Sequence, residues 1–146
     1  MKFQEINLIP WDWRVLAYYN TTEASAEGIL DVLSLLGCSG ESYERARHNL
    51  MSGQRNTGLT YTNPDVRTTV MVVSATSGPE EFWNTLDHEK GHVAEHIAEA
   101  LDIPREGEEF QYLRGSLAES MYSAAIGFVC PHCRRRWTAS APYLPI

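Results

Sequence analysis

The feature that most constrains this chain is a pair of histidines, His88 and His92, set four residues apart on a long amphipathic segment. Apolar residues recur at helical spacing along residues 79–101, and Ser77 followed by Glu80 is typical of a helix start. Positions i and i+4 share one face of a helix, so both imidazoles can reach one metal ion. The pair falls on the flank of the apolar stripe, which predicts a place beside the core and open to a cleft.

Glu89 follows the first histidine directly and completes a His-Glu-x-x-His pattern. It sits one residue round the helix, where a carboxylate can touch a metal-bound water without binding the metal. A catalytic zinc usually has three protein ligands and one water. One helix cannot surround the ion, so the third ligand must come from another element. The candidates are Glu108, at the first turn of the following helix, and Glu109 as the alternative.

Two histidine ligands on one helix and a glutamate at the start of the next resemble the gluzincin class of metallopeptidases. Residues 107–115 are similar to a Glu-Glu-x-x-Ala-Tyr-Leu-x-Gly pattern found in small gluzincin-like proteins of bacteria, phages and mobile elements. Aligning the Tyr-Leu pair places Glu108 at the second glutamate, with Gln111 in place of the alanine and Gly107 in place of the first glutamate. These departures leave the choice between Glu108 and Glu109 open.

The resemblance covers about residues 11–128 and implies a minimal zincin-like fold with a zinc-dependent metallopeptidase activity. The two histidines and Glu108 would bind Zn²⁺, and Glu89 would act as general base on the zinc-bound water. The implied substrate is a peptide or protein, whose extended chain would pair with a sheet edge formed by strand 66–74. The alternative is a catalytically inactive metal-binding interaction protein of a phage or mobile element with the same fold.

A second metal-binding pattern overlaps the first, because His92, Glu95 and His96 match the inverted His-x-x-Glu-His motif. Both cannot form one site, since His88 and His96 lie about 12 Å apart along a helix. The spacing to Glu108 favours the first pattern. His96 is then expected beside the ligands or at the surface.

Two points stay open at the proposed site. Histidines on a polar helix flank can also be solvated or hydrogen-bonded, with Glu89 paired to Lys90 or Arg105. Peptide-bond hydrolysis also needs a donor for the oxyanion, and the sequence selects none. Tyr112 and Tyr122 are the only guesses.

Cys130 and Cys133 frame a Cys-Pro-His-Cys segment that is typical of half of a structural zinc site. Cys38 could supply a third thiolate and His132 or His48 a fourth ligand, or two chains could share their cysteines across a homodimer. The alternative is a pair of reduced or oxidised cysteines in a C-terminal turn.

Composition narrows the remaining classes. With 146 residues, 43% of them hydrophobic, the chain is expected to form one domain over residues 1–146, with a core at about 11–128 and a cysteine-containing tail over 129–146. A net charge of −7 argues against nucleic-acid and anionic-membrane partners. No apolar run reaches the length of a membrane span and the N-terminus lacks a signal pattern, so a cytoplasmic location is expected.

The pattern of elements predicts an α+β fold. We expect a small mixed or antiparallel sheet with helices on one side, which packs against the histidine-bearing helix and the helix that follows it. The predicted elements are a strand at 11–19, helices at about 20–36 and 42–51, strands at 59–62 and 66–74 forming a hairpin, and helices at 79–101 and 108–128.

Overall fold

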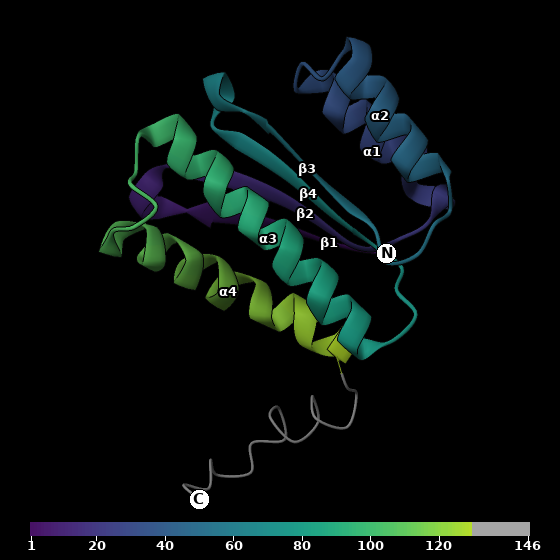
Figure 1. The fold of residues 1–146 in the computed structure, drawn as a ribbon. Helices are drawn as coiled ribbons and strands as arrows, with labels where there is room; N and C mark the ends of the chain where they lie inside the picture. The colour runs from purple at the N-terminus through teal and green to yellow at the C-terminus, as the bar shows by residue number, and fades with distance from the viewer. Residues whose placement is uncertain (130–146) are drawn as a thin grey trace, which may run out of the picture.

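The computed structural model describes residues 1–129, in which a four-stranded sheet is covered by four α-helices (Figure 1). The strands are β1 (Lys2–Leu8), β2 (Trp13–Thr21), β3 (Gly58–Asn63) and β4 (Thr68–Ser74), and the helices are α1 (Ala26–Leu35), α2 (Gly40–Met51), α3 (Pro79–Leu101) and α4 (Glu108–Val129). The fold is therefore α+β, as predicted. The predicted site at Cys130, His132 and Cys133 lies outside the described residues.

The sheet is mixed and has the strand order β1-β2-β4-β3. Two antiparallel hairpins, β1–β2 and β3–β4, are joined by the parallel pairing of β2 with β4. The expectation that strand 66–74 forms the sheet edge is wrong, because β4 lies between β2 and β3. All seven residues of β4 are buried, as a continuous β-branched run predicts for a central strand. The edge strand is β3.

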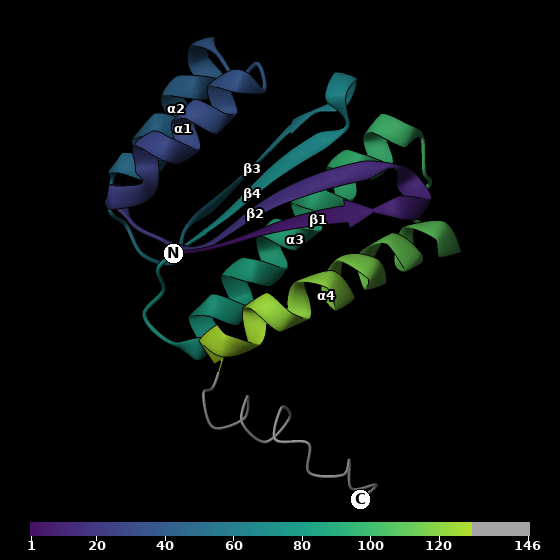
Figure 2. The same ribbon diagram turned by 180° about the vertical axis from the view of Figure 1, so that it is seen from behind.

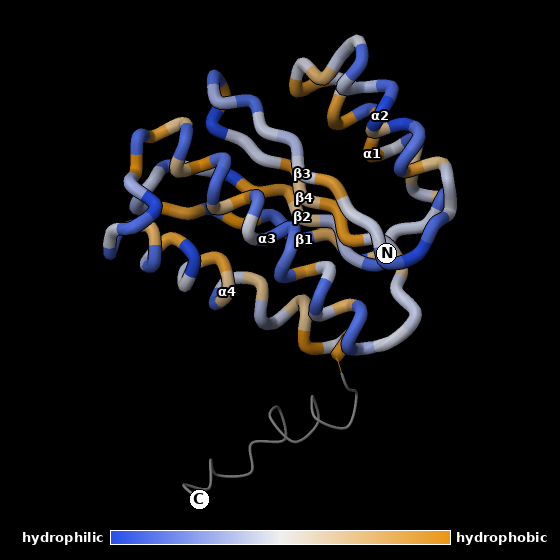
Figure 3. Tube along the Cα trace, viewed as in Figure 1, coloured by the Kyte–Doolittle hydropathy of each residue, from blue (hydrophilic) through white to orange (hydrophobic). Residues whose placement is uncertain are grey.

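Helices cover both faces of the sheet, not one face as expected (Figures 1 and 2). The reason is the strand period of two, which sends successive apolar residues of the central strands to opposite faces. In β4, Met71 and Val73 belong to the core shared with α3 and α4, whereas Val70 and Val72 belong to the core shared with α1 and α2. Figure 3 shows the hydrophobic residues concentrated along these strands and on the helix sides that face them.

Helices α3 and α4 form an antiparallel hairpin beneath one face (Figures 1 and 2). Helix α3 begins at Pro79, and the residue before it, Gly78, makes no side-chain cap. Ser77 does not cap the helix as predicted, because its backbone N–H and hydroxyl bond to Asn56 instead. The helix ends at Leu101, and the next residue, Asp102, adopts the left-handed conformation (φ 55°) with which the chain leaves the helix.

Within residues 1–129, none of the helices has both the length and the apolar character of a membrane span.

Candidate functional site

The side chains of His88 and His92 lie together on the exposed side of α3, as the spacing predicts. Their Nε2 atoms are 3.2 Å apart, and the two rings meet edge to face with centroids 4.8 Å apart. Two nitrogens bound to a tetrahedral zinc at 2.0–2.1 Å are separated by about 3.3–3.4 Å. The pair therefore has the separation that two ligands of a single ion need.

Glu89 lies beside this pair but is buried, with 6% of its surface exposed. Its Oε1 accepts a hydrogen bond from the hydroxyl of Thr60 on β3 (2.9 Å). It pairs with neither Lys90, which contacts Asp87, nor Arg105, which contacts Glu95. The carboxylate is thus held between α3 and the edge of the sheet.

Gly58 makes this arrangement possible. A Cβ at residue 58 would lie 2.6 Å from the carbonyl oxygen of Val72 and 2.7 Å from Cγ of Glu89. These distances are shorter than real Cβ contacts, so only glycine lets the backbone of β3 lie so close to the carboxylate-bearing side chain.

The outer edge of β3 carries backbone groups that do not pair with β4. Just before the strand, the backbone N–H of Ser74 donates to the carbonyl of Thr57 (2.9 Å). In an antiparallel ladder every second residue bonds to the neighbouring strand, so Thr60 and Thr62 direct their N–H and C=O groups outward. Gly58 has the same parity, and its carbonyl accepts a hydrogen bond from a side chain of α2. This edge runs beside Glu89.

His96, one turn beyond His92, is tied to the sheet by a chain of side-chain hydrogen bonds. Nε1 of Trp13 lies 3.0 Å from Oγ1 of Thr69, which is 2.8 Å from Oγ1 of Thr62, which is 2.9 Å from Nδ1 of His96. The indole can only donate, so Thr69 accepts from it. Thr69 is fully buried, and within this series of hydrogen bonds the only acceptor for its hydroxyl hydrogen is the hydroxyl of Thr62.

The other hydrogen bonds of this series indicate which atom is the donor in its last bond, between Thr62 and His96. Thr62 accepts from Thr69 and donates to Nδ1 of His96, which leaves the proton of His96 on Nε2. Once Thr62 accepts from Thr69, the hydrogen of its own hydroxyl has an acceptor among the described hydrogen bonds only at Nδ1 of His96, whereas a proton on Nδ1 would leave that hydrogen unpaired. The arrangement that pairs every hydroxyl hydrogen of these bonds therefore assigns His96 as a neutral imidazole with its proton on Nε2.

Burial lowers the pKa of His96, and the neighbouring His92 lowers it further, against the opposing effect of Glu99 and Glu95. A lowered pKa favours the same neutral ring that the hydrogen bonds require. Since its Nε2 carries the proton, His96 has no free lone pair for a metal. The inverted pattern is disfavoured for this reason, and also because Glu95 is exposed and pairs with Arg105 (3.9 Å).

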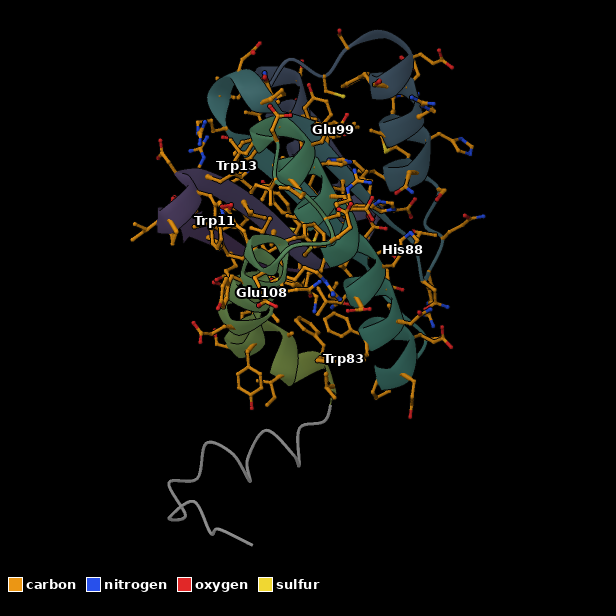
Figure 4. All side chains as sticks on the ribbon, turned by 60° about the vertical axis from the view of Figure 1, so that its left-hand side comes forward. Trp11, Trp13, Trp83, His88, Glu99 and Glu108 are labelled. Atoms are coloured by element: carbon orange, nitrogen blue, oxygen red, sulfur yellow. The ribbon has the colours of Figure 1, made fainter. Side chains whose placement is uncertain are left out.

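The structure does not bring Glu108 or Glu109 to the histidine pair. Both are exposed residues of the first turn of α4, which follows the far end of α3. His92 precedes the last residue of α3 by roughly nine positions, which is about 14 Å of helix. Figure 4 shows His88 on the side of α3 that is turned away from α4, and Glu108 at the start of α4.

Within residues 1–129, no three His, Cys, Asp or Glu side chains converge into a metal site. The assignment of Glu108 or Glu109 as third ligand therefore stays a prediction from sequence alone.

The other predicted residues lie apart from the pair. Cys38 is a buried free thiol in the core between the sheet and helices α1 and α2, and burial raises its pKa. His48 is exposed on α2. Tyr112 and Tyr122, the guessed oxyanion donors, are exposed residues of α4.

Sequence reasoning missed Gly58, Thr60 and Thr62. These three residues are every second residue of a predicted strand, so the two threonine hydroxyls and the glycine lie on the same face. This spacing is the sequence pattern from which they could have been found. It becomes informative only when that face is known to lie on the histidine-bearing helix.

An open pocket of about 320 Å³ lies at the loops that join the strands of the two hairpins, with Trp13, Arg14 and Arg67 in its lining. Arg67 donates to the carbonyls of Trp11 (2.7 Å) and Asp12 (2.9 Å), so its charge is already used in holding these loops together. None of the three histidines of α3 lines this pocket.

No protein family model, no curated protein and no solved structure matches the chain. Its function is therefore inferred from its own residues.

Proposed function

We propose that the protein is a zinc-dependent hydrolase of the metallopeptidase type, with His88 and His92 as metal ligands and Glu89 as general base. The observation that carries the proposal is the 3.2 Å separation of the two Nε2 atoms beside a buried carboxylate. Solvated surface histidines need no such neighbour, and burying a carboxylate costs free energy. An acid kept there despite that cost suits a chemical role.

The edge strand β3 supports a peptide substrate. An extended chain can add to the sheet by hydrogen bonding to the outward backbone groups of Thr60 and Thr62. Since the side chain of Thr60 holds Glu89, a peptide in this position would run beside the general base. This proposal moves the substrate edge from the 66–74 strand to β3.

The residues of this chain have distinct parts in the reaction. His88 and His92 would hold a zinc ion, which when bound supplies a more acidic water and polarises the scissile carbonyl. Glu89 takes the proton of the attacking water and passes it to the leaving amine. The hydroxyl of Thr60 fixes one oxygen of Glu89 and leaves the other for the proton.

The fit to zinc is partial, because a catalytic zinc usually has three protein ligands and the described residues bring two together. This observation favours a second candidate function, a non-catalytic metal-binding protein that uses the site to bind a partner. The two candidates differ in turnover.

Metal analysis of the purified full-length chain tests the ligands. We expect near-stoichiometric zinc in the parent and strong loss in His88→Ala. His48→Ala, an exposed histidine on α2, is the matched control and should keep the metal. Glu108→Ala should also keep it, whereas loss in that variant would mean that α4 reaches the ion. Retention of zinc in His88→Ala would refute the site.

Turnover is tested by incubating the protein with a mixed library of synthetic peptides and identifying products by mass spectrometry. Glu89→Gln should keep its zinc and lose all cleavage, because an amide cannot take the proton of water. Cleavage that survives this change would refute the mechanism. Zinc binding without any cleavage by the parent would favour the non-catalytic candidate.

A further inference from the structure

Three histidines form a row along one side of α3, but they are not equivalent. His88 and His92 are exposed and face each other through their Nε2 atoms. His96 is half-buried, its ring centroid is 6.3 Å from that of His92, and its Nδ1 is anchored to Thr62 on the edge strand. The third histidine is therefore the one that the sheet holds in a fixed orientation.

The anchoring chain determines what His96 can offer. Trp13 can only donate, and each threonine in the chain accepts one hydrogen bond and donates the next, so Nδ1 of His96 is an acceptor. The free ring nitrogen, Nε2, then carries a proton. A metal ligand must present a lone pair, whereas an oxyanion needs an N–H, so His96 suits the second purpose.

The edge strand places this donor next to the path of the proposed substrate. Thr60 holds Glu89 and Thr62 holds His96, and the two threonines are separated by one residue on the same face of β3. A peptide added to the edge of β3 would pass both groups. Hydrolysis of its scissile bond makes the carbonyl oxygen negative, and a donor fixed in advance stabilises that charge.

We propose that His96 is the oxyanion-binding residue of this hydrolase, donating its Nε2–H to the carbonyl oxygen that becomes negative, and that Trp13, Thr69 and Thr62 position it in the required tautomer. The inference rests on the proposed function. A neutral imidazole is sufficient for this role, because a donor does not have to be charged to stabilise a developing oxyanion. It replaces the two tyrosines of α4 as the candidate donor.

The tautomer is measurable without any substrate. Nitrogen-15 NMR of the full-length chain distinguishes a protonated from an unprotonated ring nitrogen, and His96→Phe assigns the signals. We expect Nε2–H and an unprotonated Nδ1 for His96. Thr62→Ser should keep this pattern, and Thr62→Val should give a mixture of tautomers. A protonated Nδ1 in the parent would overturn the proposal.

The catalytic role is tested with a peptide that the parent cleaves from the library. His96→Phe should lower kcat by about 10²–10³-fold, as loss of an oxyanion donor does elsewhere, with little change in KM and no loss of zinc. Thr62→Val, which keeps the imidazole, should lower kcat in the same direction, and Thr62→Ser should restore it. An unchanged kcat in His96→Phe would refute the role, and loss of zinc would make His96 a ligand instead.

Failure of this inference is distinguishable from failure of the proposed function. If zinc binds and Glu89→Gln abolishes cleavage while His96→Phe does not slow it, only the assignment of His96 is wrong. If the parent cleaves nothing, the hydrolase and the catalytic role of His96 fall together, and the tautomer measured by NMR still reports whether the hydrogen-bond chain exists.

Discussion

Replacing Gly58 with alanine measures how closely β3 lies over Glu89. The added Cβ would be 2.6 Å from the carbonyl oxygen of Val72 and 2.7 and 2.9 Å from Cγ and Cδ of Glu89. Val72 belongs to β4, which pairs with β2 on one side and with β3 on the other, so the sheet holds its carbonyl in place. Glu89 can move only by leaving its hydrogen bond with Thr60.

The expected cost of Gly58→Ala follows from these contacts. Overpacking of this kind costs about 1–3 kcal/mol. Loss of a hydrogen bond to a charged group costs about 1.5–3 kcal/mol. The two costs do not add fully, because a Glu89 side chain that leaves its hydrogen bond also relieves part of the overpacking. We expect the free energy of unfolding to fall by about 2–4 kcal/mol, and Tm by about 6–12 °C at roughly 3 °C per kcal/mol.

Urea denaturation of the full-length chain measures this cost in two backgrounds. In Glu89→Ala the two contacts with Glu89 are gone and the contact with the Val72 carbonyl remains, so the penalty of Gly58→Ala should shrink by about 1 kcal/mol without disappearing. Gly115→Ala in α4 is the control, since a Cβ there meets nothing within 4 Å and should stabilise the helix by about 0.5–1 kcal/mol. Equal penalties in both backgrounds would refute the view that Glu89 fills this space.

Three further predictions concern stability. Thr60→Val should destabilise the chain by about 1.5–3 kcal/mol in urea, because it leaves the buried carboxylate of Glu89 without its donor, and Thr60→Ser should not. Burial raises the pKa of the Cys38 thiol, so the contribution of the thiol to the free energy of unfolding is present below its unfolded pKa near 9 and is lost as the pH rises above that value. Urea denaturation at about pH 8 and pH 10 should show this loss of stability in the parent and a smaller loss in Cys38→Ala. Leu113→Ala, at a fully buried position of α4, should cost about 2–5 kcal/mol in thermal unfolding, whereas its exposed neighbour Tyr112→Ala should change stability by less than about 0.5 kcal/mol.

Local signals predicted the last two helices and one hairpin well, but placed the start of the first helix too early, because Asn20 belongs to β2 and α1 begins at Ala26. The expected helices 79–101 and 108–128 agree with α3 and α4, and the strands 59–62 and 66–74 do form an antiparallel hairpin. Residues 2–8 were not recognised as a strand, because β1 is an edge strand in which only Ile6 and Leu8 are buried. The parallel pairing of β2 with β4 joins segments about fifty residues apart and leaves no local pattern.

The residues of the candidate site also divide into those that local sequence predicts and those that only the tertiary structure brings together. His88, Glu89 and His92 were found because their relation depends only on the geometry of one helix. The position of Glu108 depends on which face of α4 packs against the core. Buried residues of α4 such as Phe110 determine that face, and Glu108 lies on a different side of the helix. Hydroxyl partners on β3 could not be assigned from sequence, since the strand meets α3 only after the sheet has formed.

The burial of Glu89 has a consequence for how this chain can change. A methionine of similar length would fill the same space under Gly58 without any need for a hydroxyl partner, and apolar replacements of buried charged groups are often neutral or stabilising. Selection for robustness alone would therefore remove the acid. If Glu89 has the proposed role of general base, the fold accepts a less stable interior in exchange for that role, and an apolar substitution at this one position would stabilise the domain and abolish the proposed reaction.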